Sequence, residues 1–297
     1  MRSPLPRTLS LALPPPRVPI FSSNEPLTAL YFAASVLVLK RSERSRRQTG
    51  TLELIFINSG PAGHNPLCPK GFPMADPDTQ PSSAPFVVVL EGLDGSGKSS
   101  QARILASALE DQGWRVEQPT RDPKRPLRRT YKELIANAEG FPSPRTSLLL
   151  GLSDYSYAIE QHAGSAVDLL LYERYCYSTL ADGMALGIDP ALAMPMAALF
   201  PRPDLTIFID VDPRVALERK GECTLAEAGG PDFRRQHATL EAAFVAYQSA
   251  VRAAYQQLED QKGITDLNVV DGNRSFAEVT RSIWHITSQY LMQDRAA

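Results

Sequence analysis

Residues 92–99 bring together the residue types that bind the phosphate groups of a nucleotide. The segment reads Gly92-x4-Gly97-Lys98-Ser99. Its glycines can adopt the positive φ angles that point successive backbone N–H groups at an anion, and a helix that begins there adds its positive end. In loops of this pattern the lysine reaches the β- and γ-phosphates and the hydroxyl binds Mg²⁺. The residues expected to contact the nucleotide are Gly92, Leu93, Asp94, Gly95, Ser96, Gly97, Lys98, Ser99 and Ser100.

A strand and a helix must flank such a loop, and the sequence supplies both. Residues 86–90 form a continuous apolar run, which is typical of a buried parallel strand. After the loop, Ala102, Leu105 and Leu109 recur at helical spacing, and Gly113 is placed to end that helix. This context makes a chance glycine-rich turn the weaker interpretation.

Apolar strands and amphipathic helices alternate along the rest of the chain. Further strands are expected near residues 115–117, 168–172, 205–211 and 269–270. Helices are expected over residues 127–135, 144–162, 240–258 and 276–290. This alternation predicts an α/β fold in which a five-stranded parallel sheet is covered by helices on both faces.

Charged residues follow two of the expected strands, at the edge where such sheets bind ligands. Arg121 and Asp122 come after the second strand, and Glu173 and Arg174 come directly after the third. Because parallel strands end at one edge, these side chains are expected beside the phosphate loop. Each pair also has a plainer interpretation, as a surface ion pair for the first and a strand-end ion pair for the second.

The charge of the chain argues against a nucleic-acid partner. Residues 1–84 contain nine lysines and arginines against five acidic residues, a net charge of +4, whereas residues 85–297 contain 22 against 28, a net charge of −6. A nucleic-acid interface requires a clustered basic surface. Cys68, Cys176 and Cys223 show neither metal-ligand spacing nor a disulfide framework, which favours a reducing compartment, in the first place the cytoplasm.

Residues 1–84 are rich in proline and have no sustained periodicity, so they are expected to be a low-complexity, disordered extension of a domain over residues 85–297. The apolar residues 27–39 number 13, fewer than the about 20 that span a bilayer. Three interpretations remain open. The extension is a signal-like segment, a mitochondrial or plastid transit peptide, or sequence ahead of a true start at Met74.

Four motifs resemble the thymidylate kinase family. EGLDGSGKSSQ is similar to the family's EGxDGxGKSTQ, and RPDLTIFIDVDPRVALER to its RPDLTxxLDVxPExxLxR. Residues 120–123 resemble its TREP and residues 173–178 its DR[YH]xxS. The resemblance covers residues 86–292 and implies the P-loop NTPase fold with a short mobile lid. It also implies transfer of the γ-phosphoryl group of ATP to a nucleoside monophosphate, with Mg²⁺ as cofactor, and a homodimer.

The resemblance also implies roles for individual residues. Arg121 and Arg174 would hold the phosphate group of the acceptor, a task that bidentate pairing suits to arginine. Asp94 and Glu173 would lie near the metal, the sugar or the reacting groups. The implied metal ligands are Asp94, Ser99 and Glu173, and the implied catalytic residues are Asp94, Lys98, Glu173, Arg174, Arg234 and Arg235. The implied acceptor-binding residues are Arg121, Asp122, Leu150, Asp154, Arg174, Ser178 and Asp182.

Residues 218–233, ERKGECTLAEAGGPDF, occupy the place of the family's lid. The variable positions of the phosphate loop carry no basic residue, and in that case the family pattern implies a catalytic arginine from the lid. Arg219, Arg234 and Arg235 are the candidates, with Arg219 also expected to contact ATP. Each is equally well interpreted as a solvent-exposed charge on a helix.

The sequence departs from the family where the acceptor base would bind. Leu150 and Asp154 stand where the family has an aromatic residue that stacks on thymine and an arginine that donates to it. Residues 124–126 replace GGT, residues 181–183 replace an A-Y-Q type sequence, and Glu173 replaces an aspartate. Three of these changes remove contacts that select thymine.

Because of Asp154, the identity of the acceptor base stays open. A carboxylate accepts hydrogen bonds and therefore suits an exocyclic amine such as cytosine N4, so Asp154→Arg would shift preference from cytosine toward thymine or uracil. The surrounding GLSDYSYAIE also resembles mitochondrial UMP-CMP kinases. In the other interpretation Asp154 pairs with a neighbouring arginine such as Arg145.

Three hypotheses about function follow. The first is a kinase that converts dTMP to dTDP, which the overall resemblance favours. The second is a UMP/CMP or dCMP kinase, which Asp154 favours. The third is a catalytically degenerate nucleotide-binding module, and the presence of Lys98, Ser99, Arg121 and Arg174 argues against it.

Overall fold

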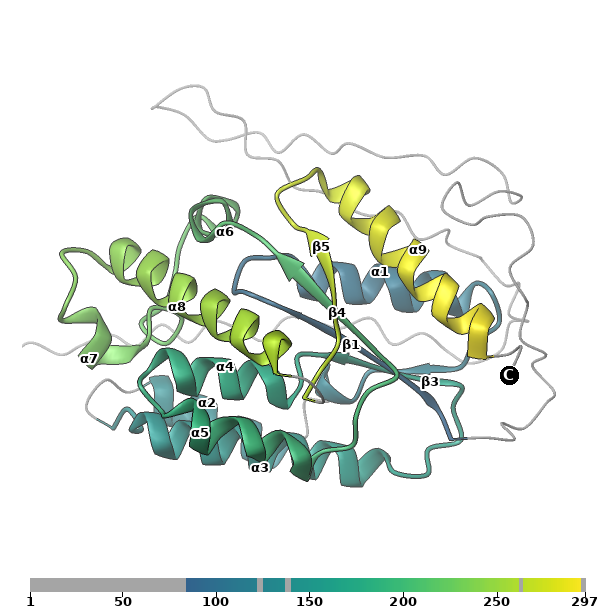
Figure 1. The fold of residues 1–297 in the computed structure, drawn as a ribbon, viewed down its shortest axis with the longest axis horizontal. Helices are drawn as coiled ribbons and strands as arrows, with labels where there is room; N and C mark the ends of the chain where they lie inside the picture. The colour runs from purple at the N-terminus through teal and green to yellow at the C-terminus, as the bar shows by residue number, and fades with distance from the viewer. Residues whose placement is uncertain (1–83, 122–124, 137–139, 262–263, 295–297) are drawn as a thin grey trace, which may run out of the picture. The chain divides into compact units, whose positions relative to one another are not determined.

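Five parallel strands form the centre of the fold, in the order β2-β3-β1-β4-β5 (Figure 1). Each strand pairs in parallel with its neighbours. The central strand β1 leads into the phosphate loop, so the loop lies between the ends of β3 and β4. This confirms the expected five-stranded parallel sheet. The strands are β1 (Phe86–Gly92), β2 (Val116–Glu117), β3 (Leu169–Glu173), β4 (Leu205–Asp210) and β5 (Leu267–Asp271).

The computed structural model describes residues 84–121, 125–136, 140–261 and 264–294. The predictions for residues 1–83, among them the possible start at Met74, lie outside these ranges, as does Asp122. Among the helices within them, none has the length and apolar character needed to cross a membrane.

Helices connect the strands and flank the sheet. The expected ones are α1 (Lys98–Glu110), α2 (Pro126–Ala136), α3 (Pro144–His162), α8 (Leu240–Asp260) and α9 (Phe276–Asp294). The sequence analysis did not anticipate η1 (Pro119–Arg121), α4 (Cys176–Ala185), α5 (Pro190–Ala193), η2 (Met194–Leu199), α6 (Pro213–Lys220) and α7 (Gly230–Arg234).

The strands bury side chains on both faces of the sheet. Val88 and Leu90 of β1 pack into a core with α1 and α9, whereas Val89 between them packs into a second core with α3, α4 and α8. In Figure 1, α1 and α9 accordingly lie on one side of the sheet and α4 and α8 on the other. Because side chains alternate along a strand, the uninterrupted apolar run of β1 reflects burial on both faces.

Short polar side chains fix where the helices around the site begin. Ser143 caps α3 by accepting a hydrogen bond from the backbone of Thr146 at 3.2 Å. Asp212 and Thr239 cap α6 and α8 in the same way. Such caps satisfy backbone N–H groups that a helix leaves without partners. They fix the starts of α6, at whose end the lid segment begins, and of α8, which follows that segment.

Candidate active site

The phosphate loop adopts the conformation that its glycines permit. The φ angles are 146° at Gly92, 85° at Gly95 and 93° at Gly97. A Cβ atom on Gly95 would lie 2.5 Å from the carbonyl oxygen of Ala216, and one on Gly92 would lie 2.7 Å from that of Ile209. The loop therefore packs directly on the backbone of β4 and α6, where a larger residue does not fit.

Lys98 is buried at the centre of this loop, with 5% of its surface exposed. Its Nζ donates hydrogen bonds to the carbonyl oxygens of Gly92 at 2.8 Å and Leu93 at 2.5 Å. Burial lowers the pKa of Lys98 to about 7, and the charge of Arg174 acts in the same direction. A bound phosphate would favour the charged form and so oppose this shift.

Arg174 forms an ion pair with Asp94 of the phosphate loop. Burial would raise the pKa of Asp94, but the charges of Arg174 and Lys98 outweigh it and hold this pKa below its usual value. Arg174 has a positive φ of 68°, and no other non-glycine residue in the described ranges has a positive φ. A left-handed conformation at a bulky residue is strained and is typical of functional sites.

Glu91, which the sequence analysis did not single out, holds the backbone after Arg174. Its carboxylate accepts a hydrogen bond from the backbone N–H of Tyr175 at 2.8 Å and another from the Tyr255 hydroxyl at 2.7 Å. Glu91 is fully buried, and this burial raises its pKa to about 7. The sequence feature that could have identified Glu91 is its position as an acidic residue at the end of an apolar strand.

Ser99 and Glu173 lie together beside the loop. The Ser99 hydroxyl donates to the Glu173 carboxylate. The backbone N–H of Glu173 donates to the Thr120 hydroxyl at 2.9 Å. Within the described part of the chain, no group of three or more His, Cys, Asp or Glu side chains could hold a metal alone. Two oxygen donors beside a phosphate loop fit Mg²⁺, which usually takes its remaining ligands from phosphates and water.

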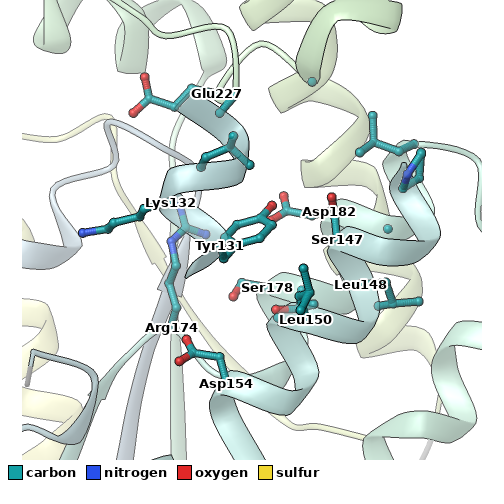
Figure 2. A pocket seen from close by; sticks show the side chains of 18 of the residues that line it. Tyr131, Lys132, Ser147, Leu148, Leu150, Asp154, Arg174, Ser178, Asp182 and Glu227 are labelled. Carbon is teal, nitrogen blue, oxygen red and sulfur yellow. The ribbon is translucent and has the colours of Figure 1, made fainter. Parts of the chain in front are cut away.

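A cavity of about 260 Å³ extends from the Asp94–Arg174 pair between α2, α3, α4 and the lid segment (Figure 2). Five of the predicted acceptor-binding residues line it, namely Leu150, Asp154, Arg174, Ser178 and Asp182. Arg121 ends η1, and its side chain lies outside what the structure describes. The sequence analysis missed several lining residues, among them Tyr131, Lys132, Ser147, Glu227 and Tyr247.

Asp182 contributes a second carboxylate to the cavity wall. The hydroxyl of Tyr247 donates to its Oδ1 at 3.0 Å. Burial raises the pKa of Asp182 to about 6, although the charge of Arg174 opposes the shift. Ser178, one turn earlier on α4, instead donates to the carbonyl oxygen of Tyr175 at 2.9 Å.

Asp154 is engaged in a buried ion pair whose partner is Arg125. The Arg125 guanidinium donates to both carboxylate oxygens of Asp154, and its Nε lies 3.2 Å from Oδ1. The side chains are 6% and 4% exposed. The structural interpretation of Asp154 is therefore supported, although its partner is not Arg145. Arg125 belongs to the tripeptide that replaces the family's GGT.

Two of the three predicted lid arginines, Arg234 and Arg235, bond within four residues of their own positions, whereas Arg219 bonds to a distant part of the chain. Arg219 donates to the carbonyl oxygen of Gly272 at 2.6 Å, next to β5. Arg234 donates to that of His237 at 2.7 Å, and Arg235 pairs with Asp232. None of these three partners belongs to the phosphate loop.

Lys220 is the lid cation that the sequence analysis missed. Its Cδ would lie 3.1 Å from a Cβ on Gly95, and its Nζ pairs with Glu227 at 3.0 Å. The charge of Lys220 also helps to lower the pKa of Asp94. The lid segment thus places a positive charge, that of Lys220, beside the phosphate loop.

Comparisons with known proteins agree with this geometry. The family model for thymidylate kinase matches residues 90–283. A thymidylate kinase of Syntrophotalea carbinolica is 31% identical over 69% of this chain and 96% of its own length. One of Pelobacter propionicus is 32% identical over 67% and 91%, and a probable thymidylate kinase of Pyrococcus abyssi is 28% identical over 70% and 98%. The chain therefore belongs to the thymidylate kinase family and is a nucleoside monophosphate kinase.

Proposed function

We propose that this chain transfers the γ-phosphoryl group of ATP to dTMP and releases dTDP and ADP. The observation that carries the proposal is the Asp94–Arg174 ion pair, which joins the phosphate loop to the cavity lined by the predicted acceptor residues. One element of the site thereby serves both nucleotides. Phosphoryl transfer depends mainly on positioned cations around a spreading negative charge, and this is the arrangement that the site offers.

The residues divide between the two nucleotides. The backbone N–H groups of residues 92–100 and the Lys98 ammonium bind the phosphates of ATP. Ser99 and Glu173 would hold Mg²⁺, which supplies charge neutralisation at the phosphate oxygens when bound. Arg174, with Arg121, binds the phosphate of the acceptor. Asp94 orients Arg174.

The lid completes the charge around the transferred group. Lys220 is the lid cation best placed to do so, since its side chain already lies against Gly95. Arg234 and Arg235 would have to leave their present partners to take part. Arg219 donates a hydrogen bond to the backbone of Gly272 and so fixes the backbone on the ATP side of the site.

The base is read by a wall that differs from the family pattern. Both oxygens of Asp154 accept hydrogen bonds from Arg125, so this carboxylate is already neutralised by a buried cation and is a weaker acceptor for a cytosine amine. This observation favours dTMP. The Asp182 carboxylate, which also lines the cavity, favours the second candidate, a CMP or dCMP acceptor with an exocyclic amine.

A coupled assay of the purified chain with ATP and five acceptors separates these functions. We expect kcat/KM to be highest for dTMP among dTMP, dUMP, UMP, CMP and dCMP. Higher values for CMP or dCMP would establish the second candidate instead. Binding of ATP without turnover of any acceptor would mean that the chain is a degenerate nucleotide-binding module.

Substitution of Gly95 by alanine is expected to weaken ATP binding. The new Cβ would lie 2.5 Å from the Ala216 carbonyl oxygen at a φ of 85°, so the loop must shift. Strain of about 1–3 kcal/mol corresponds to a rise of about 5- to 150-fold in the KM for ATP. Gly187→Ala is the matched control, because Gly187 also has a positive φ, 91°, but nothing within 4 Å of the added Cβ. Equal KM values in the two variants would contradict the packing argument.

Assembly and compartment are part of the same proposal. By analogy with the family, the chain forms a homodimer through apolar helix faces, and Leu149 on α3, which is 51% exposed, is consistent with this. Cys176 and Cys223 are both free thiols, which supports a reducing compartment such as the cytoplasm. A mitochondrial or plastid location remains the alternative if the N-terminal extension is a transit peptide.

A further inference from the structure

Gln248 is a buried residue on α8 whose side-chain amide bonds to the phosphate loop and to the lid segment. Its exposed surface is 2%. Its Oε1 accepts a hydrogen bond from the backbone N–H of Asp94 in the phosphate loop at 3.1 Å. Its Nε2 donates to the backbone carbonyl oxygen of Glu227 in the lid segment at 3.0 Å, and lies 3.5 Å from Asp94 Oδ2. One side chain therefore joins the lid to the phosphate loop.

The packing of α8 gives no reason for an amide at this position. Phe244 and Val251, one turn before and after Gln248 on the same helix face, are both buried apolar residues. A buried amide lowers stability unless its polar atoms find partners, so an apolar side chain would serve the core at least as well. The partners that Gln248 does find belong to the two segments that must meet during phosphoryl transfer.

The Glu227 end of this connection fixes the lid's own cation. The Glu227 carboxylate pairs with Lys220 at 3.0 Å and accepts from the backbone N–H of Thr224 at 2.9 Å. Lys220 lies against Gly95 of the loop. Holding the Glu227 backbone thus also sets where Lys220 stands relative to the phosphates of ATP.

We propose that Gln248 is a positioning residue that latches the lid to the phosphate loop. By fixing the Asp94 N–H and the Glu227 carbonyl group together, it makes closure of the lid and alignment of the loop a single event. Closure excludes water from the reacting phosphate, so the latch suppresses hydrolysis of ATP in favour of transfer to the acceptor. The inference rests on the proposed function, since it presupposes that the chain transfers a phosphoryl group.

The test compares Gln248→Met with Gln101→Met. Gln101 is equally buried, with 2% exposed, but its amide bonds to Phe276 and Thr280 of α9. The two substitutions remove the same group from the same kind of environment, so a general loss of stability appears in both melting temperatures. We measure kcat and KM with dTMP and, separately, the release of ADP from ATP without an acceptor.

For Gln248→Met we expect kcat for transfer to dTMP to fall by about 10- to 100-fold. The ratio of two rates, ADP release without an acceptor divided by transfer to dTMP, should rise by at least about tenfold. Gln101→Met should leave this ratio at its wild-type value. An unchanged ratio in a folded Gln248→Met variant overturns the latch. If Gln248→Met does not fold, Gln248→Asn takes its place in the test, because its shorter side chain cannot reach both partners. If wild type and Gln101→Met transfer to no acceptor, the proposed function fails. If wild type, Gln101→Met and Gln248→Met all transfer with the same ratio, the latch alone is refuted.

Discussion

Replacing Lys98 with alanine is expected to lower kcat by about 10²- to 10⁴-fold without unfolding the chain. The Nζ of Lys98 bonds to the carbonyl oxygens of Gly92 and Leu93, both within the phosphate loop. These bonds orient the ammonium without joining distant parts of the core. Loss of the ammonium therefore removes a positive charge from beside the transferred phosphoryl group. It should change the free energy of unfolding little. The measurement is single-turnover transfer from ATP to dTMP beside the melting temperature.

The matched control is Arg214→Ala, which removes an exposed positive charge from α6. It should leave kcat within about twofold of wild type, since isolated surface charges contribute little. Near-normal turnover in Lys98→Ala would show that the loop does not bind the phosphates as proposed.

The same variant tests the burial of the ammonium in the absence of nucleotide. Burial lowers the pKa of Lys98 to about 7 in the fold, below the ordinary lysine value of 10.5. Between these values the unfolded chain binds more protons at this position, so the contribution of Lys98 to the free energy of unfolding rises with pH. Relative to Lys98→Ala, the wild type should therefore gain stability between pH 7 and 9. Parallel pH profiles of the two proteins would contradict the lowered pKa.

The fold could be predicted from the sequence where periodicity is local and strong. The helix expected over residues 144–162 is α3, Pro144–His162, and the apolar run at residues 86–90 is the core of β1. The sequence analysis missed α4 because Cys176–Ala185 begins inside a motif read as a strand end. It missed α6 and α7 because helices of eight and five residues show no clear period.

The site could be predicted where its residues are close in sequence. The phosphate loop and the Glu173–Arg174 dipeptide follow their strands directly, so motif and topology together place them. The contacts of Glu91 with Tyr255 and of Asp94 with Gln248 join residues 164 and 154 positions apart. No local pattern predicts such pairs. Their one signal is a polar residue in a buried place, as with Gln248 between Phe244 and Val251 on the apolar face of α8.

Asp154→Ala is expected to lower the free energy of unfolding by about 3–5 kcal/mol, because it leaves the Arg125 guanidinium buried without its partner. The two side chains are 4% and 6% exposed, and Arg125 also lies over the ring of Tyr155, 5.4 Å from its centre. Denaturant unfolding of the wild type and the variant measures the difference. Asp266→Ala is the control: Asp266 pairs with Arg202 in the open, at 86% and 50% exposure, and its loss should cost less than about 1 kcal/mol.

The same pair changes what Asp154→Arg alone would do. Two buried guanidinium groups would face each other, so this variant should lose stability before any shift in base preference can be measured. Exchanging the charges, with Arg125→Asp and Asp154→Arg together, keeps one partner for each charge and places an arginine on α3, where it can donate to a thymine carbonyl. We expect the double variant to recover most of the stability that Asp154→Ala loses and to raise kcat/KM for dTMP relative to dCMP by about 5- to 150-fold. A double variant as unstable as Asp154→Ala would show that the pair depends on its surroundings rather than on its charges, and an unchanged preference would show that α3 does not read the base.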